Sequence, residues 1–126
     1  PVEVLKFIKD FRFSLLDKVY RTPLNKSIYD WYVSQLLYRH VLLPSGEITI
    51  QDRGNPSGQI STTMDNNMVN TFLQAFEFSY IHSCEPDVWR LWCESDSIVY
   101  GDDRLSSWSS VPDDYVDLVV SMYKNV

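Results

Sequence analysis

The sequence predicts a small α+β fold, with helices packed on short antiparallel strands. From Thr62 onward, apolar residues recur every three or four positions, which is the period of an amphipathic helix. Two short apolar runs flank Pro44-Ser45-Gly46, and two more flank Gly101-Asp102. Turn residues between strand-like runs are typical of β-hairpins. Helices and hairpins therefore alternate along one chain, without linkers or repeats.

The first 40 residues are expected to form two helices. Pro1 suits the first position of the first helix. Its apolar stripe consists of Val4, Ile8, Phe11, Leu15 and Val19. Pro23 separates this helix from a second one, expected over residues 28–38, where Ser27 and Asp30 resemble a capping box. A hairpin with strands at 41–43 and 47–50 follows.

A glycine-containing loop at residues 54–58 leads into the third helix. Thr62 is expected to cap this helix, with Asp65 as an imperfect capping-box partner, and the helix should end near residues 84–86. Residues 88–93 fit a short helix or a strand. A last helix is expected from Pro112 through Tyr123.

Asp102 and Asp103 are the residues with the clearest chemical potential. Residues 98–100 read as a strand, and Gly101-Asp102 suits a tight turn that needs a positive φ. Such a turn places carboxylates at the tip of a hairpin, where they can hold paired Mg²⁺ ions that drive phosphoryl transfer. A solvated Gly-Asp turn is the simpler interpretation of these residues alone.

The start of the third helix offers a second candidate site. Thr62 and Asn66 are four residues apart and share one face of the first turn. Their hydroxyl and amide groups can hydrogen-bond a sugar hydroxyl. A capped amphipathic helix after a loop explains the same residues without any ligand.

Composition limits the possible functions. The chain has a net charge of −6 and a pI of about 4.7, with its 11 Lys and Arg residues dispersed among 17 acidic ones. This balance argues against autonomous RNA binding, because phosphate contacts supply most nonspecific affinity. The two cysteines and two histidines have no metal-ligand spacing, and no phosphate-binding Gly-x-x-x-x-Gly-Lys loop occurs.

Taken together, the two segments resemble motifs B and C of viral RNA-dependent RNA polymerases. Ser57-Gly58, Thr62 and Asn66 reproduce the spacing S-G-x-x-x-T-x-x-x-N, and residues 100–103 reproduce the Gly-Asp-Asp signature. The sequence of residues 54–70 is most similar to that of the astrovirus polymerase. The resemblance implies a partial polymerase palm spanning residues 1–126, from after motif A through motif D. A fingers insertion near residues 24–56 forms the attached hairpin.

The resemblance also implies site residues, cofactors and partners. Asp102 and Asp103 would be catalytic and would bind Mg²⁺ or Mn²⁺. Ser57, Gly58, Thr62 and Asn66 would bind the nucleotide, with the polar three recognising the ribose 2′-hydroxyl. The partners would be an RNA template-primer, nucleoside triphosphates and the rest of the polymerase, including motif A, fingers and thumb.

By the same resemblance, the parent would be a viral polyprotein that replicates and transcribes RNA in the host cytoplasm, at membrane-associated sites. The isolated fragment, which lacks motif A, is expected to be inactive. Two alternatives remain open: a reverse-transcriptase-like palm, which also carries a Tyr-x-Asp-Asp hairpin, and a noncatalytic palm-like interaction module.

Overall fold

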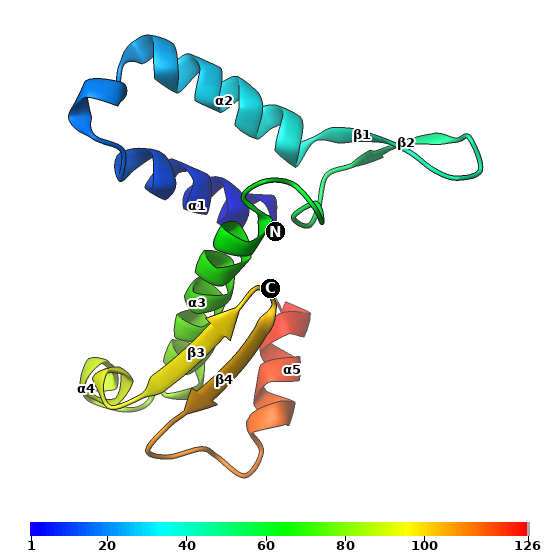
Figure 1. The fold of residues 1–126 in the computed structure, drawn as a ribbon. Coiled ribbons are helices and arrows are strands. Elements are labelled where there is room, and N and C mark those ends of the chain that lie inside the picture. The colour runs from blue at the N-terminus through cyan, green and yellow to red at the C-terminus, as the bar shows by residue number, and fades with distance from the viewer. Residues whose placement is uncertain (126) are drawn as a thin grey trace. The chain divides into compact units, whose positions relative to one another are not determined.

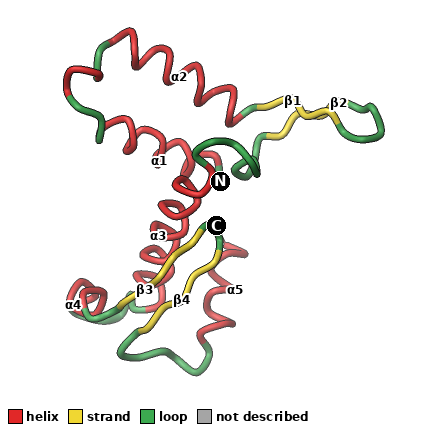
Figure 2. The backbone as a smooth tube through the Cα atoms, in the orientation of Figure 1, coloured by secondary structure: helices red, strands yellow, loops and turns green. Residues whose placement is uncertain are grey.

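The computed structural model describes residues 1–125 and divides the chain into two compact units (Figure 1). The first unit is Pro1–Val69 and the second begins at Asn70. One long helix, α3 (Thr62–Ile81), contributes residues to both. Helices and two separate two-stranded antiparallel sheets are both present, which confirms the α+β prediction (Figure 2).

The first unit contains two helices and a hairpin before α3 begins. They are α1 (Val2–Ser14), a 3₁₀ turn (Lys18–Tyr20), α2 (Pro23–Leu37), β1 (Arg39–Leu42) and β2 (Ile48–Gln51). Leu5 of α1 packs against Val33 and Leu37 of α2, and Val69 of α3 packs on this cluster. This small apolar core holds the start of α3 against both helices.

The predicted helix boundaries in this unit need two corrections. The first helix ends at Ser14, so Leu15 and Val19 lie outside it and are exposed. Its buried face is Leu5, Ile8, Lys9 and Phe13, and Phe11 is exposed. The predicted stripe therefore missed a buried lysine, because apolar spacing alone does not indicate a paired charge.

The second helix starts five residues earlier than predicted, at Pro23. The hydroxyl of Thr22 accepts a hydrogen bond from the backbone N–H of Asn25 at 3.2 Å, which is an N-cap. Pro23 then occupies the first helical position, where its missing N–H costs nothing. The proline opens α2 instead of separating it from α1, and Ser27 lies inside the helix.

The β1–β2 hairpin confirms the strand prediction for residues 41–50. His40 pairs with Ile50 and Leu42 with Ile48. Gly46, in the predicted turn, has a φ of +88°, a conformation that glycine adopts without steric cost.

The second unit is built around the C-terminal part of α3. It contains α4 (Val88–Cys93), β3 (Asp96–Tyr100), β4 (Asp103–Ser107) and α5 (Tyr115–Asn125) (Figure 1). Residues 88–93 are thus helical, and the N–H of Arg90 is capped by the Asp87 carboxylate. Phe78 is buried among the rings of His82, Trp92 and Trp108 and forms the aromatic centre of this unit.

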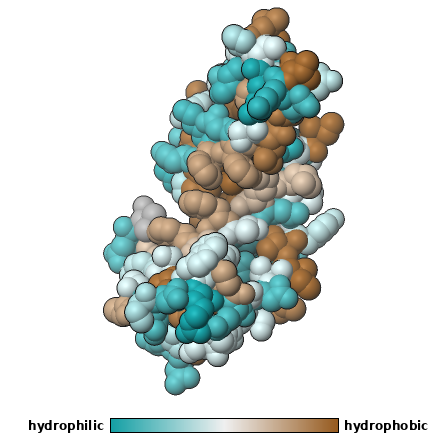
Figure 3. Space-filling view, turned by 90° about the vertical axis from the view of Figure 1, so that its left-hand side faces the viewer, coloured by the Kyte–Doolittle hydropathy of each residue, from teal (hydrophilic) through white to brown (hydrophobic). Residues whose placement is uncertain are grey.

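Many large apolar side chains are exposed in both units. Figure 3 shows hydrophobic residues scattered among hydrophilic ones on one face. Trp31 and Trp89, for example, are 66% and 73% exposed. Across residues 1–125, none of the helices has the length and apolar character needed to cross a membrane.

Candidate active site and its supporting contacts

The two adjacent aspartates lie at the tip of the β3–β4 hairpin, as predicted. Tyr100 pairs with Asp103 across the strands, so Gly101 and Asp102 form a two-residue turn. Gly101 has a φ of +66°, and no non-glycine residue has a positive φ among those described. This is the φ pattern of a type II′ turn. Asp102 and Asp103 are both exposed, so their carboxylates are accessible to ligands.

The side chain of Asn70, in α3, holds the backbone of this turn. Its side-chain Nδ2 donates to the carbonyl oxygens of Asp102 at 2.9 Å and of Gly101 at 3.3 Å. Both turn carbonyls are therefore engaged by one amide, which restrains the backbone that carries the carboxylates. No motif in the sequence singles out Asn70 as a support for the turn. Its position, four residues after Asn66 on the same helix, is the signal that could have drawn attention to it.

The strand after the turn fixes the direction of the second aspartate. Arg104 binds Glu77 of α3, and Ser106 accepts from Gln74 at 2.5 Å. Alternate residues of a strand point to opposite faces. Asp103 therefore points away from the α3 face, toward solvent. Arg104 forms a part-buried ion pair with Glu77 on that face.

Glu77 is the centre of a buried polar cluster behind the hairpin. Besides Arg104, its carboxylate accepts from the hydroxyls of Tyr123 at 2.7 Å and Tyr115 at 3.4 Å. Burial, followed by the hydrogen bond to Glu77 and the charge of that carboxylate, raises the pKa of Tyr123. These contacts connect α5, β4 and α3 within the second unit.

The hairpin tip fits a divalent metal in ligand type. Carboxylate oxygens are the ligands that Mg²⁺ prefers, and both side chains are open to solvent. Over the described residues, no group of three or more His, Cys, Asp or Glu side chains gathers in a way that could hold a metal. Asp102 and Asp103 can thus supply only part of a coordination shell.

The second candidate site belongs to the first unit. Ser57 and Gly58 are exposed in the loop before α3, and Gly58 has a φ of +82°. Thr62 is the first residue of α3, and its hydroxyl contacts the carbonyl oxygens of Pro56 at 2.7 Å and Gln59 at 2.9 Å. The capping prediction for Thr62 is therefore wrong: its hydroxyl closes the loop onto the helix start.

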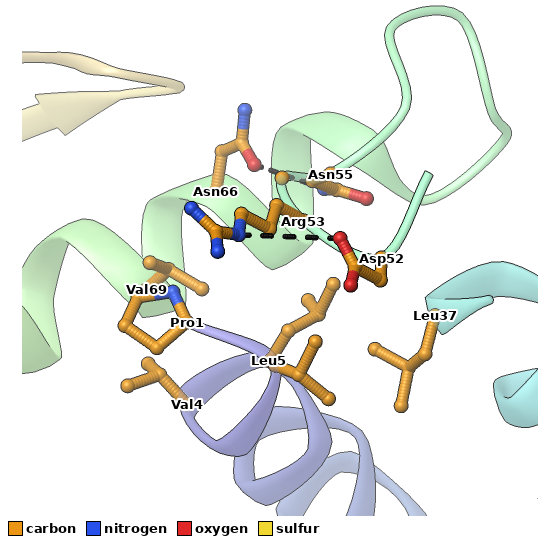
Figure 4. Close-up of a pocket in the computed structure, with 11 residues that line it drawn as sticks. Pro1, Val4, Leu5, Leu37, Asp52, Arg53, Asn55, Asn66 and Val69 are labelled. Carbon is orange, nitrogen blue, oxygen red and sulfur yellow. Dashed lines mark hydrogen bonds and ion pairs between the residues drawn. The ribbon is translucent and has the colours of Figure 1, made fainter. Parts of the chain in front are cut away.

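Asn66 lies one turn further along α3 and is held by the loop. Its Oδ1 accepts from Nδ2 of Asn55 at 2.9 Å, and the same Nδ2 contacts the carbonyl of Thr62 at 3.3 Å. Figure 4 shows the Asn66 oxygen directed at Asn55 and its nitrogen directed away. The NH₂ group of Asn66 is thus the end directed away from Asn55.

Asp65 is a buried ion-pair centre and not a capping-box residue. The side chain is fully buried and accepts from Lys9 at 2.6 Å, Arg12 at 2.5 Å and Ser61 at 2.8 Å. Lys9 is itself only 1% exposed. Burial by itself raises the pKa of the Asp65 carboxyl, but the hydrogen bonds from Lys9, Ser61 and Arg12 outweigh it and hold the pKa below its usual value.

A small cavity lies beside Asn55 and Asn66 (Figure 4). Pro1 and Leu5 of the α1 end, Arg53 of the loop and Val69 of α3 also line it. Its volume is about 90 Å³. Pockets for whole small-molecule ligands are roughly 300–1,000 Å³, so this cavity accommodates only part of a ligand.

Comparison with known proteins identifies the family. The viral RNA-dependent RNA polymerase family matches residues 4–126. Non-structural polyprotein 1AB of ovine astrovirus 1 is 56% identical over the whole chain, and that of human astrovirus-1 is 53% identical. The same polyprotein of turkey astrovirus 1 is 44% identical over 132 residues, again covering the whole chain.

The chain spans about a tenth of the length of these relatives: 10%, 8% and 8% respectively. No solved structure gives a significant match. The family match favours the RNA polymerase prediction over the reverse-transcriptase-like alternative. With a match over nearly its full length, this chain belongs to the viral RNA-dependent RNA polymerase family, and it is a fragment similar to the astrovirus polyprotein.

Proposed function

We propose that this chain is part of the palm of an RNA-directed RNA polymerase and carries its metal-binding hairpin. The observation that supports this best is the β3–β4 turn, where two exposed carboxylates stand on a backbone held by Asn70. This restraint keeps the two carboxylates in a defined place, as a metal-binding turn requires. The β1–β2 hairpin would belong to the fingers insertion.

The reaction is attack of a primer 3′-hydroxyl on the α-phosphorus of a nucleoside triphosphate, with release of pyrophosphate. Asp102 would be the principal ligand for Mg²⁺ or Mn²⁺, and Asp103 would support the same site. When bound there, two metals would supply charge neutralisation and activation of the attacking hydroxyl. An aspartate of motif A would complete the protein's share of the ligands.

Sugar selection is the task of the loop and the first turn of α3. Ser57, Thr62 and Asn66 contribute to a hydrogen-bond network around the ribose 2′-hydroxyl, the group that separates RNA from DNA substrates. The NH₂ group of Asn66, directed away from Asn55, supports this role, because it can donate to the 2′-oxygen. Gly58 gives the loop the freedom to move as the template advances.

The partners are an RNA template-primer, nucleoside triphosphates and the rest of the polymerase. The net charge of −6 means that the basic surface for RNA comes from other segments. The parent acts in viral RNA replication and transcription in the host cytoplasm, at membrane-associated sites. A noncatalytic palm-like module remains the alternative for the isolated chain.

The test is Asp102→Asn in the full-length polymerase. Asparagine keeps the side-chain volume but removes the charge that holds the metal, so we expect incorporation to be abolished while the fold stays intact. Asp96→Asn is the matched control, since Asp96 is an exposed carboxylate at the other end of the same hairpin. Near-normal turnover of Asp102→Asn with Mg²⁺ would reduce the hairpin to a simple turn.

A further inference from the structure

We propose that Asn55 is a positioning residue that decides which end of the Asn66 amide faces the ribose. The inference rests on the proposed role of Asn66 in sugar selection. A side-chain amide has one donor end and one acceptor end, and the two differ little in shape. Something in the protein must therefore fix its orientation if the donor end is to meet the sugar.

The contact that fixes it is the hydrogen bond from Asn55 Nδ2 to Asn66 Oδ1, at 2.9 Å. This bond occupies the acceptor end of Asn66 and leaves the NH₂ group directed away (Figure 4). The same Nδ2 of Asn55 also contacts the carbonyl oxygen of Thr62 at 3.3 Å. The carbonyl oxygen of Thr62 can only accept a hydrogen bond, so it requires the NH₂ group of Asn55 to face α3.

The other end of Asn55 faces the NH₂ group of Gln59. Nε2 of Gln59 contacts Oδ2 of Asp65 and Oγ of Ser61, each at 2.9 Å, and Oδ1 of Asn55 at 3.4 Å. An ionised carboxylate accepts hydrogen bonds only, so Asp65 obliges Gln59 to present its NH₂ group. The oxygen of Gln59 meanwhile accepts from the backbone N–H of Ser61 at 3.0 Å.

These contacts form a polar relay with one direction. The buried Asp65 carboxylate, paired with Lys9, orients Gln59; Gln59 orients Asn55; and Asn55 orients Asn66. All members lie in the first unit. The relay ends in the NH₂ group of Asn66, a donor that can bind the 2′-oxygen of a ribonucleotide. A deoxyribonucleotide has no 2′-oxygen to accept this hydrogen bond.

The experiment compares kcat/KM for ribo- and deoxyribonucleotides in the full-length polymerase. Asn55→Asp offers Asn66 an acceptor instead of a donor and so favours the flipped amide, which presents its oxygen to the ribose. We expect the ribo-to-deoxyribo ratio to fall about five-fold or more, the effect of losing one hydrogen bond. Asn55→Ala, which leaves Asn66 free to adopt either orientation, should lower the ratio less.

Asn25→Asp is the matched control. Asn25 lies in the same unit, is exposed, and donates through its side chain to the carbonyl of Tyr20 at 2.7 Å. The same chemical change there should leave the ratio unchanged. A purely structural role for Asn55 would lower kcat/KM for both sugars equally, so the ratio separates positioning from stability.

Asn66→Ala distinguishes failure of the inference from failure of the proposed function. If Asn66→Ala lowers the ratio but both Asn55 variants keep it, the relay is overturned. An unchanged ratio in Asn66→Ala removes the proposed role of Asn66, and the inference falls with it. In the Asn55→Ala/Asn66→Ala double variant we expect no further fall beyond Asn66→Ala, and an additive fall would make the two residues independent. Should Asn55→Asp not fold, Asn55→Ala and this double variant decide the outcome.

Discussion

Asp65→Asn tests whether the buried ion-pair centre holds the start of α3. Asparagine keeps the shape of the side chain but removes the negative charge opposite Lys9 and Arg12. Lys9 is 1% exposed, so its ammonium would be left in the interior without a counter-charge. Removing one partner of a buried pair typically costs about 3–5 kcal/mol. We expect a local loss of that order at residues 55–69.

Hydrogen exchange of the full-length polymerase measures this loss locally. At about 1.4 kcal/mol per factor of ten, exchange of amides in the first turns of α3 should accelerate by roughly a hundred-fold or more. Asp10→Asn is the control, because Asp10 of the same α1 helix pairs with Lys26 at the surface, where such pairs contribute at most about 1 kcal/mol.

The double variant Lys9→Met/Asp65→Asn sharpens the test. It removes the unpaired charge of Lys9, so it should recover part of the protection lost in Asp65→Asn.

The pH dependence of stability in acid gives an independent check. The pKa of Asp65 is depressed in the folded state, so its contribution is present above the unfolded value of about 3.9 and is lost as the pH falls through the folded pKa. If amide exchange in the first turns of α3 accelerates no more in Asp65→Asn than in Asp10→Asn, this account of the α3 start is refuted.

Three further outcomes are expected. The purified 126-residue chain should incorporate no nucleotide above a metal-free control, because other segments supply the remaining metal ligands and the basic RNA surface. Asn70→Ala leaves Asp102 unmutated but removes the donor to both turn carbonyls, so kcat of the full-length enzyme should fall roughly five-fold or more. An unchanged kcat would show that the turn keeps its position without Asn70. The pKa of Tyr123 is raised in the folded state, so its contribution is present below the unfolded value of about 10 and is lost as the pH rises toward the folded pKa; thermal unfolding of wild type and Tyr123→Phe from pH 8 to 11 should show a steeper loss in wild type.

The sequence predicted the elements better than it predicted the contacts. Turn chemistry identified both hairpins, because a glycine with positive φ between apolar runs has few other uses. The start of α2 was misplaced since Ser27-Asp30 imitates a cap, whereas Thr22-Pro23 is the actual one. Thr22-Pro23 is itself a local start signal, an N-cap followed by a proline at the first helical position, so the local pattern offered two starts and the wrong one was chosen.

The motif residues of the candidate site were predicted from the sequence. The residues that hold them in place were not. Asp102, Asp103, Thr62 and Asn66 are recognisable because their spacing matches a family pattern. Their placement in a working polymerase site stays a prediction. The supporting residues have no such pattern.

The polar residues of α3 explain why the support escaped notice. Thr62, Asn66 and Asn70 repeat at four-residue intervals, the spacing of residues on one face of a helix. Each nevertheless has a different partner: loop carbonyls for Thr62, the amide of Asn55 for Asn66, and the hairpin turn for Asn70. A helical repeat predicts that residues share a face, but not which segment covers each turn of it. Functional and supporting residues on α3 therefore look alike in sequence, and only the partner that each one contacts distinguishes them.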